Sequence, residues 1–315
     1  PLAWLTWRLV EEPFRRPERV RRPAFVAWTA LGGGAVTAAM AAMVLTGGYP
    51  ARLPQPVLAA DAAFRAVEDA RLDAVRSAVC HFNEQRRATQ GRDAFLAAWN
   101  CLGDGRALIV GDSHAADRAM ALLLAGVDVG QMTVANCSIT PSLMRGDCRP
   151  LFEALRGKLQ AAGWRGTLVL ANAFSLRELE PARLEEMVAY WRRFPHERLV
   201  VVGSVPDFYD VRQRLLKAML AGGLPDWGGV ALAPAFDSPF SHAALSDDPA
   251  TQELLAGLGV AYVSARKIYC AIEELTDCGL MLPGGALAQV NNGHLSVEGA
   301  RRFGSGLASA LGLAD

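Results

Sequence analysis

The sequence has no excess of charge of either sign, because 32 lysines and arginines balance 32 aspartates and glutamates over 315 residues. A protein that binds nucleic acid through its overall charge needs a surplus of basic residues. We therefore expect no nucleic-acid partner. The sequence also contains no internal repeat and no low-complexity tract. It begins with Pro1 rather than methionine, so we expect it to be part of a longer polypeptide.

Charged side chains are absent from residues 23–51, "PAFVAWTALGGGAVTAAMAAMVLTGGYPA". As a helix, residues 24–46 would extend about 35 Å, enough to cross a bilayer core of about 30 Å. A signal peptide has a shorter apolar core, and here the charged stretch "WRLVEEPFRRPERVRRP" comes first, so we discount that interpretation. The pattern predicts a membrane-spanning helix, with a buried core helix as the alternative.

Five arginines lie just before this apolar run: Arg15, Arg16, Arg19, Arg21 and Arg22. On the other flank only Arg52 lies nearby. Basic flanks of membrane helices stay on the cytoplasmic side. We therefore expect everything after residue 50 to lie outside the cytoplasm.

The six cysteines lack the doubled CxxC spacing of a zinc site, and we expect no metal. They fall into three pairs that are close in sequence: Cys80 with Cys101, Cys137 with Cys148, and Cys270 with Cys278. Many pairings of six cysteines are possible, and we predict disulfides within the local pairs, formed in an oxidising compartment. The alternative is six unrelated buried thiols.

From about residue 105 onward, short apolar runs alternate with helical patterns. The runs begin at residues 107, 131, 167, 198 and 260, and read "ALIV", "QMTVA", "TLVLA", "RLVVVG" and "VAYVS". Runs of this kind are typical of buried parallel strands. The regular alternation predicts a parallel sheet covered by helices on both faces, a three-layer α/β domain.

Ser113, in "ALIVGDSHAADRAM", lies just past the carboxyl end of the first predicted strand, where α/β sheets bind their ligands. The same position suits a helix N-cap, made by Asp112 or Ser113. A nucleophilic serine needs a base, and His294, in a predicted loop before the last helix, can reach the same edge of the sheet. His114 directly follows the serine and could be a structural residue of the turn in which the serine lies. The remaining histidines are expected at the surface: His81, His196 and His242.

Three motifs carry a resemblance to one family, in the order in which that family has them. "WRLVEEPFRRP" at 7–17 resembles the end of the membrane domain of acyltransferase type 3 proteins. "GDSHA" at 111–115 and "GHLSVEGA" at 293–300 are similar to the first and last motif blocks of the SGNH hydrolases fused to such membrane domains, and the local cysteine pairs also resemble those of the fused domains. The resemblance implies a three-layer SGNH or flavodoxin-like αβα fold with a central parallel sheet, preceded by a transmembrane helix. It also implies transfer of acyl groups, commonly acetyl, to surface glycans.

Carried over by position, the resemblance makes Ser113 the nucleophile and His294 the general base. Oxyanion stabilisation would come from the Ser113 amide and from Asn172 in "LVLANAF", although a turn-forming asparagine fits that position equally well. The family's glycine block has no clean match. The loop "ANCSITPS" at 135–142 takes its place, with the Ser138 amide as a candidate donor.

One residue departs from the family pattern. The family has an aspartate three residues before the histidine, where this chain has Asn291. An asparagine can orient an imidazole through its carbonyl oxygen, but it gives no charge to stabilise the imidazolium. We therefore predict Asn291 as the partner of His294, with Asp277 and Asp237 as loop residues that could substitute for it.

The predicted organisation has four parts: 1–22, the end of a membrane acyltransferase domain; 23–46, a transmembrane helix; 47–104, a linker and helical extension; and 105–315, the SGNH-like domain. The leading hypothesis is an O-acyltransferase, most commonly O-acetyl, at a bacterial inner membrane with its SGNH-like domain in the periplasm. It would modify a cell-surface glycan through a Ser113 acyl-enzyme. Its expected partners are the membrane acyltransferase domain of the same polypeptide, with acyl-CoA as donor there, and the glycan acceptor. This segment itself is expected to hold no cofactor.

Two other functions stay open at this point. An SGNH esterase or deacetylase would use the same acyl-enzyme, because water and a sugar hydroxyl attack it alike. A glycan-binding module that has lost catalysis is the alternative from another class, motivated by Asn291. Its candidate sugar-stacking residues, which are equally good core residues, are Trp164, Trp191 and Trp227.

Overall fold

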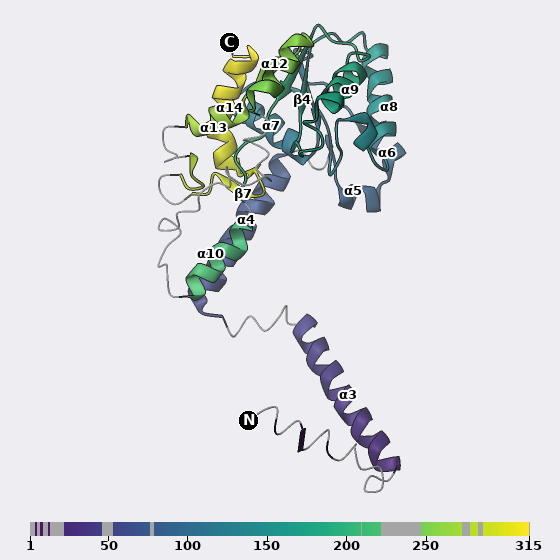
Figure 1. Cartoon of the computed structure of the whole chain (residues 1–315), viewed down its shortest axis with the longest axis vertical. Helices are drawn as coiled ribbons and strands as arrows, with labels where there is room; N and C mark the ends of the chain where they lie inside the picture. Colours follow the sequence, from purple (N-terminus) through teal and green to yellow (C-terminus); the bar gives the residue numbers. More distant parts are fainter. Residues whose placement is uncertain are drawn as a thin grey trace. The chain divides into compact units, whose positions relative to one another are not determined.

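The structure is a computed structural model. Apart from Trp4, Trp7, Arg8 and Glu12, it describes residues 22–45, 53–75, 79–208, 210–221, 247–272, 278–282 and 286–314. The chain divides into two compact units, Pro1–Leu58 and Ala59–Asp315. The boundary falls at the start of helix α4, Gln55–Ala74 (Figure 1).

The first unit contains helix α3, Arg22–Leu45. Its segment Val26–Leu45 has a mean hydropathy of 1.5 and no buried residues, and it is the one described helix long and apolar enough to cross a membrane. Large apolar side chains such as Trp28 and Val44 are exposed along it. A soluble core helix would bury them, so the core-helix alternative does not fit this segment.

The second unit is built on a six-stranded sheet in the order β1-β3-β2-β4-β5-β6, with every neighbouring pair parallel. The strands are β1 His81–Phe82, β2 Ala107–Gly111, β3 Gly130–Val134, β4 Thr167–Ala171, β5 Arg198–Val202 and β6 Ala261–Val263. The five predicted strands are confirmed. The two-residue edge strand β1 was missed because a run so short has no detectable period.

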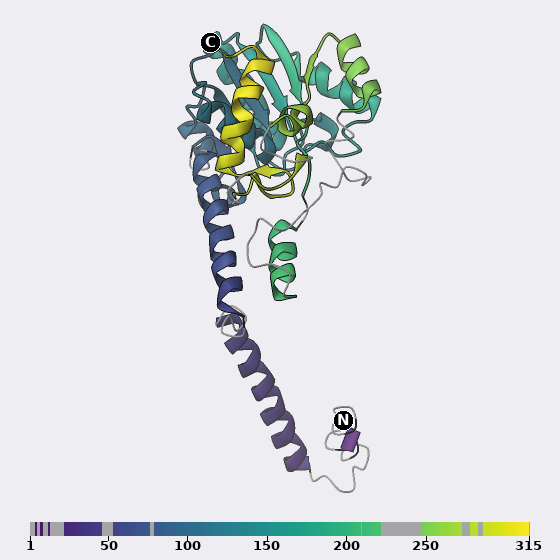
Figure 2. The same cartoon turned by 90° about the vertical axis from the view of Figure 1, so that its left-hand side faces the viewer.

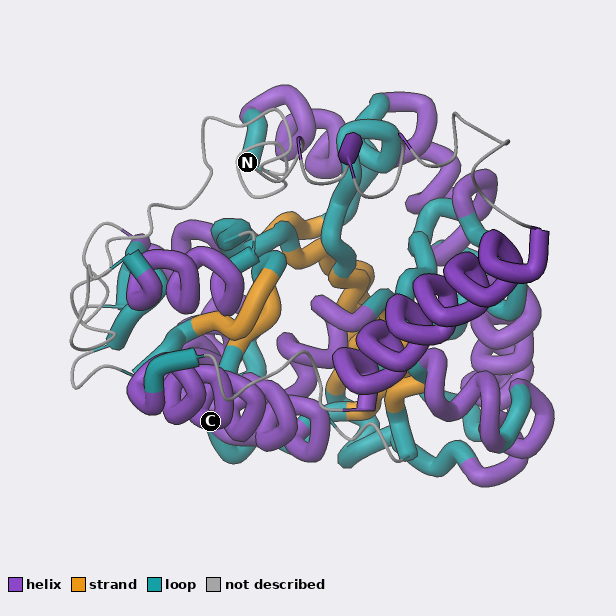
Figure 3. The backbone as a smooth tube through the Cα atoms, turned by 90° about the horizontal axis from the view of Figure 1, so that it is seen from below, coloured by secondary structure: helices purple, strands orange, loops and turns teal. Residues whose placement is uncertain are grey.

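Helices cover both faces of this sheet, which confirms the predicted three layers (Figures 2 and 3). Successive residues of a strand point to opposite faces, so Ile109 of β2 packs in one apolar cluster while Leu108 and Val110 pack in another. The Ile109 cluster includes helices α7 Ser113–Leu124, α10 Val211–Leu220, α13 Ala265–Cys270 and α14 Val297–Leu311, with α4. The other cluster includes α6 Arg92–Ala98, α8 Cys148–Ala161, α9 Pro181–Trp191 and α12 Pro249–Gly257. Two further short helices are α5 Glu84–Thr89 and the 3₁₀ helix η3 Pro141–Leu143.

The three predicted disulfides are confirmed: Cys80–Cys101, Cys137–Cys148 and Cys270–Cys278. No cysteine is free. The first bridge ties the segment before β2 to edge strand β1, and the second ties the loop after β3 to α8. The alternative of six buried thiols is therefore wrong.

Reduction of the disulfides is expected to lower the free energy of unfolding substantially. Their sequence separations are 21, 11 and 8 residues, and loops of this size each contribute about 2–3 kcal/mol by restricting the unfolded chain. Thermal melts with and without reductant measure the effect. Peptide mapping under non-reducing conditions checks the pairing, and bridges between distant cysteines would contradict it.

Two of the tryptophans considered for sugar stacking, and one histidine expected at the surface, are buried. Trp191 is fully buried and donates through Nε1 to the carbonyl of Ile139 at 2.8 Å, and Trp164 is also buried. Both are core residues rather than sugar-stacking platforms, while Trp227 lies outside the described residues. The expectation of a surface His81 is wrong: it is buried on β1, and burial together with the charge of Arg71 lowers its pKa to about 4.

Candidate active site

Ser113 is the first residue of helix α7, directly after strand β2. Strand β2 ends at Gly111, whose φ is +152° and where an added Cβ would lie 1.7 Å from the carbonyl oxygen of Ala171 on β4. Only glycine allows this close approach. The N-cap of α7 is Asp112, whose Oδ1 accepts from the amides of His114 at 2.8 Å and Ala115 at 3.3 Å. Because Asp112 does the capping, the hydroxyl of Ser113 is free for another role.

His294 lies on a hairpin that the sequence analysis described as a loop. The strands β7 Gln289–Asn291 and β8 His294–Leu295 are antiparallel and joined by Asn292 and Gly293, with φ of +41° and +74°. Positive φ at both central residues is the type I′ geometry that "NG" favours in two-residue hairpins. The hairpin brings His294 Nε2 to 3.3 Å from Ser113 Oγ, across 181 residues of sequence.

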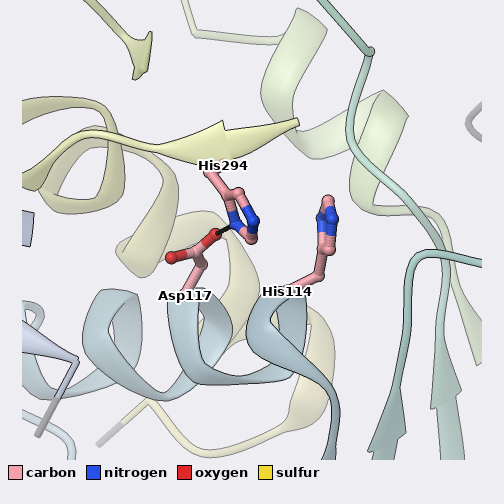
Figure 4. Close-up of side chains that lie close together, drawn as sticks. All are labelled: His114, Asp117 and His294. Atoms are coloured by element: carbon pink, nitrogen blue, oxygen red, sulfur yellow. Dashed lines mark hydrogen bonds and ion pairs between the residues drawn. The ribbon is translucent and has the colours of Figure 1, made fainter. Parts of the chain in front are cut away.

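The other ring nitrogen of His294 contacts an acid that the sequence analysis did not consider. Nδ1 lies 2.8 Å from Asp117 Oδ2, and the amide of Leu295 donates to the same oxygen at 3.2 Å. Asp117 is on α7, one turn after Ser113, and is completely buried (Figure 4). The three side chains thus form a Ser–His–Asp chain of contacts.

This geometry corrects the prediction for Asn291. Asn291 pairs with His294 through the backbone of the hairpin, whereas the acceptor at Nδ1 is the carboxylate of Asp117. The physical reason is that α7 carries Asp117 on the same face as Ser113, because residues four apart share a helix face. The alternative acids Asp237 and Asp277 lie outside the described residues.

A buried arginine forms an ion pair with Asp117. Arg71 of α4 donates from Nε to Asp117 Oδ1 at 2.8 Å, and its Nη2 lies 2.6 Å from that oxygen. Burial raises the pKa of Asp117, but the charges of Arg71 and His294 more than offset it and hold the pKa below its usual value. Asp117 therefore stays ionised at neutral pH.

His114, Asp117 and His294 also have the chemistry of metal ligands, and one ligand atom from each lies within 4.8 Å of the others. The rings of His114 and His294 stack at 4.3 Å between centroids (Figure 4). However, Arg71 already places a positive charge against the Asp117 carboxylate. The contacts fit a hydrogen-bonded cluster better than a metal centre, because a cation there would be repelled by Arg71.

The two candidate oxyanion residues meet at Glu178. Asn172, which directly follows β4, donates from Nδ2 to Glu178 Oε1 at 2.7 Å, and the hydroxyl of Ser138 donates to the same oxygen at 2.6 Å. Glu178 Oε2 accepts from the amide and hydroxyl of Ser175. These residues and Asp112 line a cavity of about 310 Å³. Nδ2 of Asn172 carries a second hydrogen, which leaves a donor for an oxyanion.

Residues 79–309 match the family model described as "SGNH domain (fused to AT3 domains)". The chain belongs to this SGNH family. Its fold is that of an acyl-handling enzyme, an esterase or an acyltransferase. One similar solved structure is the crystal structure of a protein assigned as a GDSL-like lipase from Parabacteroides merdae, with 12% identity and a TM-score of 0.35. The similarity covers 68% of this chain and 99% of that one. No curated protein matches the sequence.

Asn172→Ala in the SGNH domain is expected to lower kcat by about 10²–10³-fold with little change in KM, the usual effect of losing one oxyanion donor. The matched control is Ser138→Ala, which loses the same kind of bond to Glu178 but keeps its backbone amide; its kcat is expected to stay within about threefold. Steady-state kinetics on a chromogenic acetyl ester measure both. Similar losses in the two variants would show that Asn172 acts only by holding Glu178.

Proposed function

We propose that this chain is the acyl-transfer part of a membrane O-acyltransferase, which passes an acetyl group through Ser113 to a hydroxyl of a cell-surface glycan. The observation that carries the proposal is the contact chain from Ser113 Oγ to His294 Nε2 and from His294 Nδ1 to Asp117. A serine hydroxyl becomes a nucleophile when an adjacent base can take its proton, and a third group must orient that base.

In the first step, Ser113 Oγ attacks the acyl carbonyl while its proton moves to His294 Nε2. Asp117 holds the Nδ1 hydrogen and stabilises the imidazolium that forms. The Ser113 amide and the second Asn172 hydrogen would stabilise the negative charge on the carbonyl oxygen. The carbon–oxygen bond to the leaving group then breaks, and the leaving group takes the proton from Nε2, giving an ester at Ser113.

In the second step a glycan hydroxyl enters where the first leaving group left. His294 Nε2 takes the hydroxyl proton, the hydroxyl oxygen attacks the acyl carbon, and the bond to Ser113 breaks as Oγ recovers the proton. Water can follow the same route, and the product is then a free acid. Transfer therefore depends on how well the acceptor excludes water from the cavity beside Asp112.

The membrane setting supports transfer over hydrolysis. The family description names fusion to membrane acyltransferase domains, and helix α3 is apolar and long enough to span a bilayer. In this proposal the membrane domain of the same polypeptide takes the acyl group from acyl-CoA. The SGNH domain receives it on the periplasmic side of a bacterial inner membrane, where disulfides are stable.

The test is to incubate the purified chain in detergent with a chromogenic acetyl ester, with and without a candidate glycan. An acetyltransferase consumes the ester faster when the glycan is present and yields O-acetylated glycan, which mass spectrometry detects. Ser113→Ala is the background for both products. Acetate release that is unaffected by any glycan offered would identify an esterase instead.

The esterase stays the second candidate, because it needs the same triad. The binding-module alternative loses its motivation, since it rested on the missing carboxylate at Asn291. Asp117 supplies a carboxylate at His294 Nδ1 from a different element, and the described tryptophans proposed for sugar stacking are buried.

A further inference from the structure

Helix α4 lies outside the matched SGNH region of residues 79–309, yet it supplies a side chain to the centre of the candidate site. Arg71, in the last turn of α4, is only 6% exposed. Besides its contacts to Asp117, its Nη2 donates to the carbonyl oxygen of Ser113 at 3.4 Å. A segment between the apolar helix and the matched domain therefore contacts Asp117 and the backbone of Ser113.

Arg71 divides the two oxygens of Asp117 between different partners. The guanidinium takes Oδ1 through both Nε and Nη2, while Oδ2 accepts from His294 Nδ1 and the amide of Leu295. A planar guanidinium has a fixed fork of donors, so it also fixes the plane of the carboxylate it binds. Without it, the carboxylate of Asp117 could turn away from His294.

Arg71 also contacts the imidazole itself. Its Nη2 lies 2.8 Å from His294 Nδ1, and in the tautomer that can serve as a base both groups are donors aimed at Asp117. Asp117 therefore holds both groups at once, Arg71 through Oδ1 and His294 through Oδ2.

Other titratable groups surround His294 on several elements. They are Asp117 and His114 on α7, Asp112 at its cap, His81 on β1 and Asp207 in the loop after β5, together with the buried Arg118 behind Asp117. His81 is neutral, since its pKa is lowered to about 4. Asp117 is the carboxylate that touches the ring, and Arg71 is the described cation that touches both.

We propose that Arg71 is a positioning residue of the Ser113 site: it turns Asp117 toward His294, so that the Nδ1 hydrogen is held on Asp117 and Nε2 faces Ser113. The inference rests on the proposed function, because it takes His294 as the base. It gives the helical segment before the matched domain a part in catalysis, so that displacement of α4 would switch the triad off.

The experiment compares Arg71→Ala and Arg71→Lys in the full chain, with Arg65→Ala as the matched control. Arg65 lies on the same helix, but its side chain is 61% exposed, and its ion-pair partner among the described residues is Asp61. The kinetic readouts are kcat and KM for a chromogenic acetyl ester at neutral pH, and recovery of activity by added guanidinium chloride. An independent readout is the ¹⁵N spectrum of the histidine-labelled chain, with His294 assigned through His294→Gln.

We expect Arg71→Ala to lower kcat at neutral pH by at least about tenfold, equivalent to about 1.4 kcal/mol in the barrier, with KM nearly unchanged. Added guanidinium restores part of the rate, and the His294 signals show the hydrogen shared between Nδ1 and Nε2 where the wild type carries it on Nδ1. Arg71→Lys keeps the positive charge but lacks the two-donor geometry of the guanidinium, so its kcat is expected to lie between those of Arg71→Ala and the wild type. Arg65→Ala is expected to behave as wild type.

Wild-type kcat in Arg71→Ala would overturn the inference. So would a loss that guanidinium does not restore and that leaves the His294 signals unchanged, because that pattern reports only a structural role. If Arg71→Ala does not fold, the same measurements are made on Arg71→Lys, and wild-type kcat in that variant would overturn the inference. The spectra do not depend on turnover: an inactive wild type whose His294 signals still respond to Arg71 would contradict the proposed function and support this inference.

Discussion

Asp117→Asn is expected to lower kcat for ester turnover by about 10⁴-fold, the loss that this change produces in a serine-protease triad. An asparagine amide can donate to His294 Nδ1, which places the ring proton on Nε2, where it faces Ser113 and blocks proton transfer. Asn291→Ala is the control, since Asn291 pairs with His294 through the hairpin backbone while Asp117 contacts Nδ1. Its kcat is expected to stay within about threefold of wild type. Steady-state kinetics on an acetyl ester compare the two.

Asp117→Asn also leaves the buried Arg71 without its counter-ion, and breaking such a pair costs about 3–5 kcal/mol of stability. Thermal melts must therefore show that the variant is folded at the assay temperature. The double variant Arg71→Gln, Asp117→Asn removes both charges, so it is expected to regain stability but not activity. If Asn291→Ala lost as much activity as Asp117→Asn, the assignment of the acid to Asp117 would be wrong.

Ser113→Ala is expected to abolish acyl-enzyme formation and to lower ester turnover by at least about 10⁴-fold. The fold should be nearly unaffected, because the cap of α7 is made by Asp112 and not by Ser113. Loss of an N-cap would instead lower stability by about 1 kcal/mol. Activity and melting temperature are measured on the same preparation. A variant that keeps its activity and melts lower would show that Ser113 is a capping residue and that another group reacts.

Much of the fold could be predicted because its strands are buried on both faces and read as continuous apolar runs. The runs at 107, 131, 167 and 198 became β2, β3, β4 and β5 with small shifts at their ends. The hairpin of β7 and β8 was missed, although its "NG" turn at 292–293 is a strong local signal. Its strands are only three and two residues long, too short for a period to show.

The site was predictable where a motif marked it and not where only the fold brings residues together. Ser113 and His294 lie in short motifs, and the structure places them in contact. Asp117 carried a usable signal, because it lies four residues after Ser113 on a predicted helix and so on the same face. The resemblance drew attention to position 291 instead.

Arg71 carried no local signal at all. It is one of two arginines on the amphipathic helix α4, and nothing in the sequence separates it from the exposed Arg65. Its partners Asp117 and His294 lie 46 and 223 residues further along the chain. Contacts of this range follow from how the layers pack, which a single sequence does not reveal.

Mass spectrometry of the acid-quenched protein during its first turnover of an acetyl ester tests the Ser113 acyl-enzyme most directly. We predict one added acetyl group on the wild-type chain, located by peptide mapping on the peptide that contains Ser113, lost on addition of the glycan acceptor and absent from Ser113→Ala. Asp117→Asn should acquire it far more slowly. Ester turnover with no acetyl on that peptide, or an equal acetyl load on Ser113→Ala, would contradict the proposed mechanism.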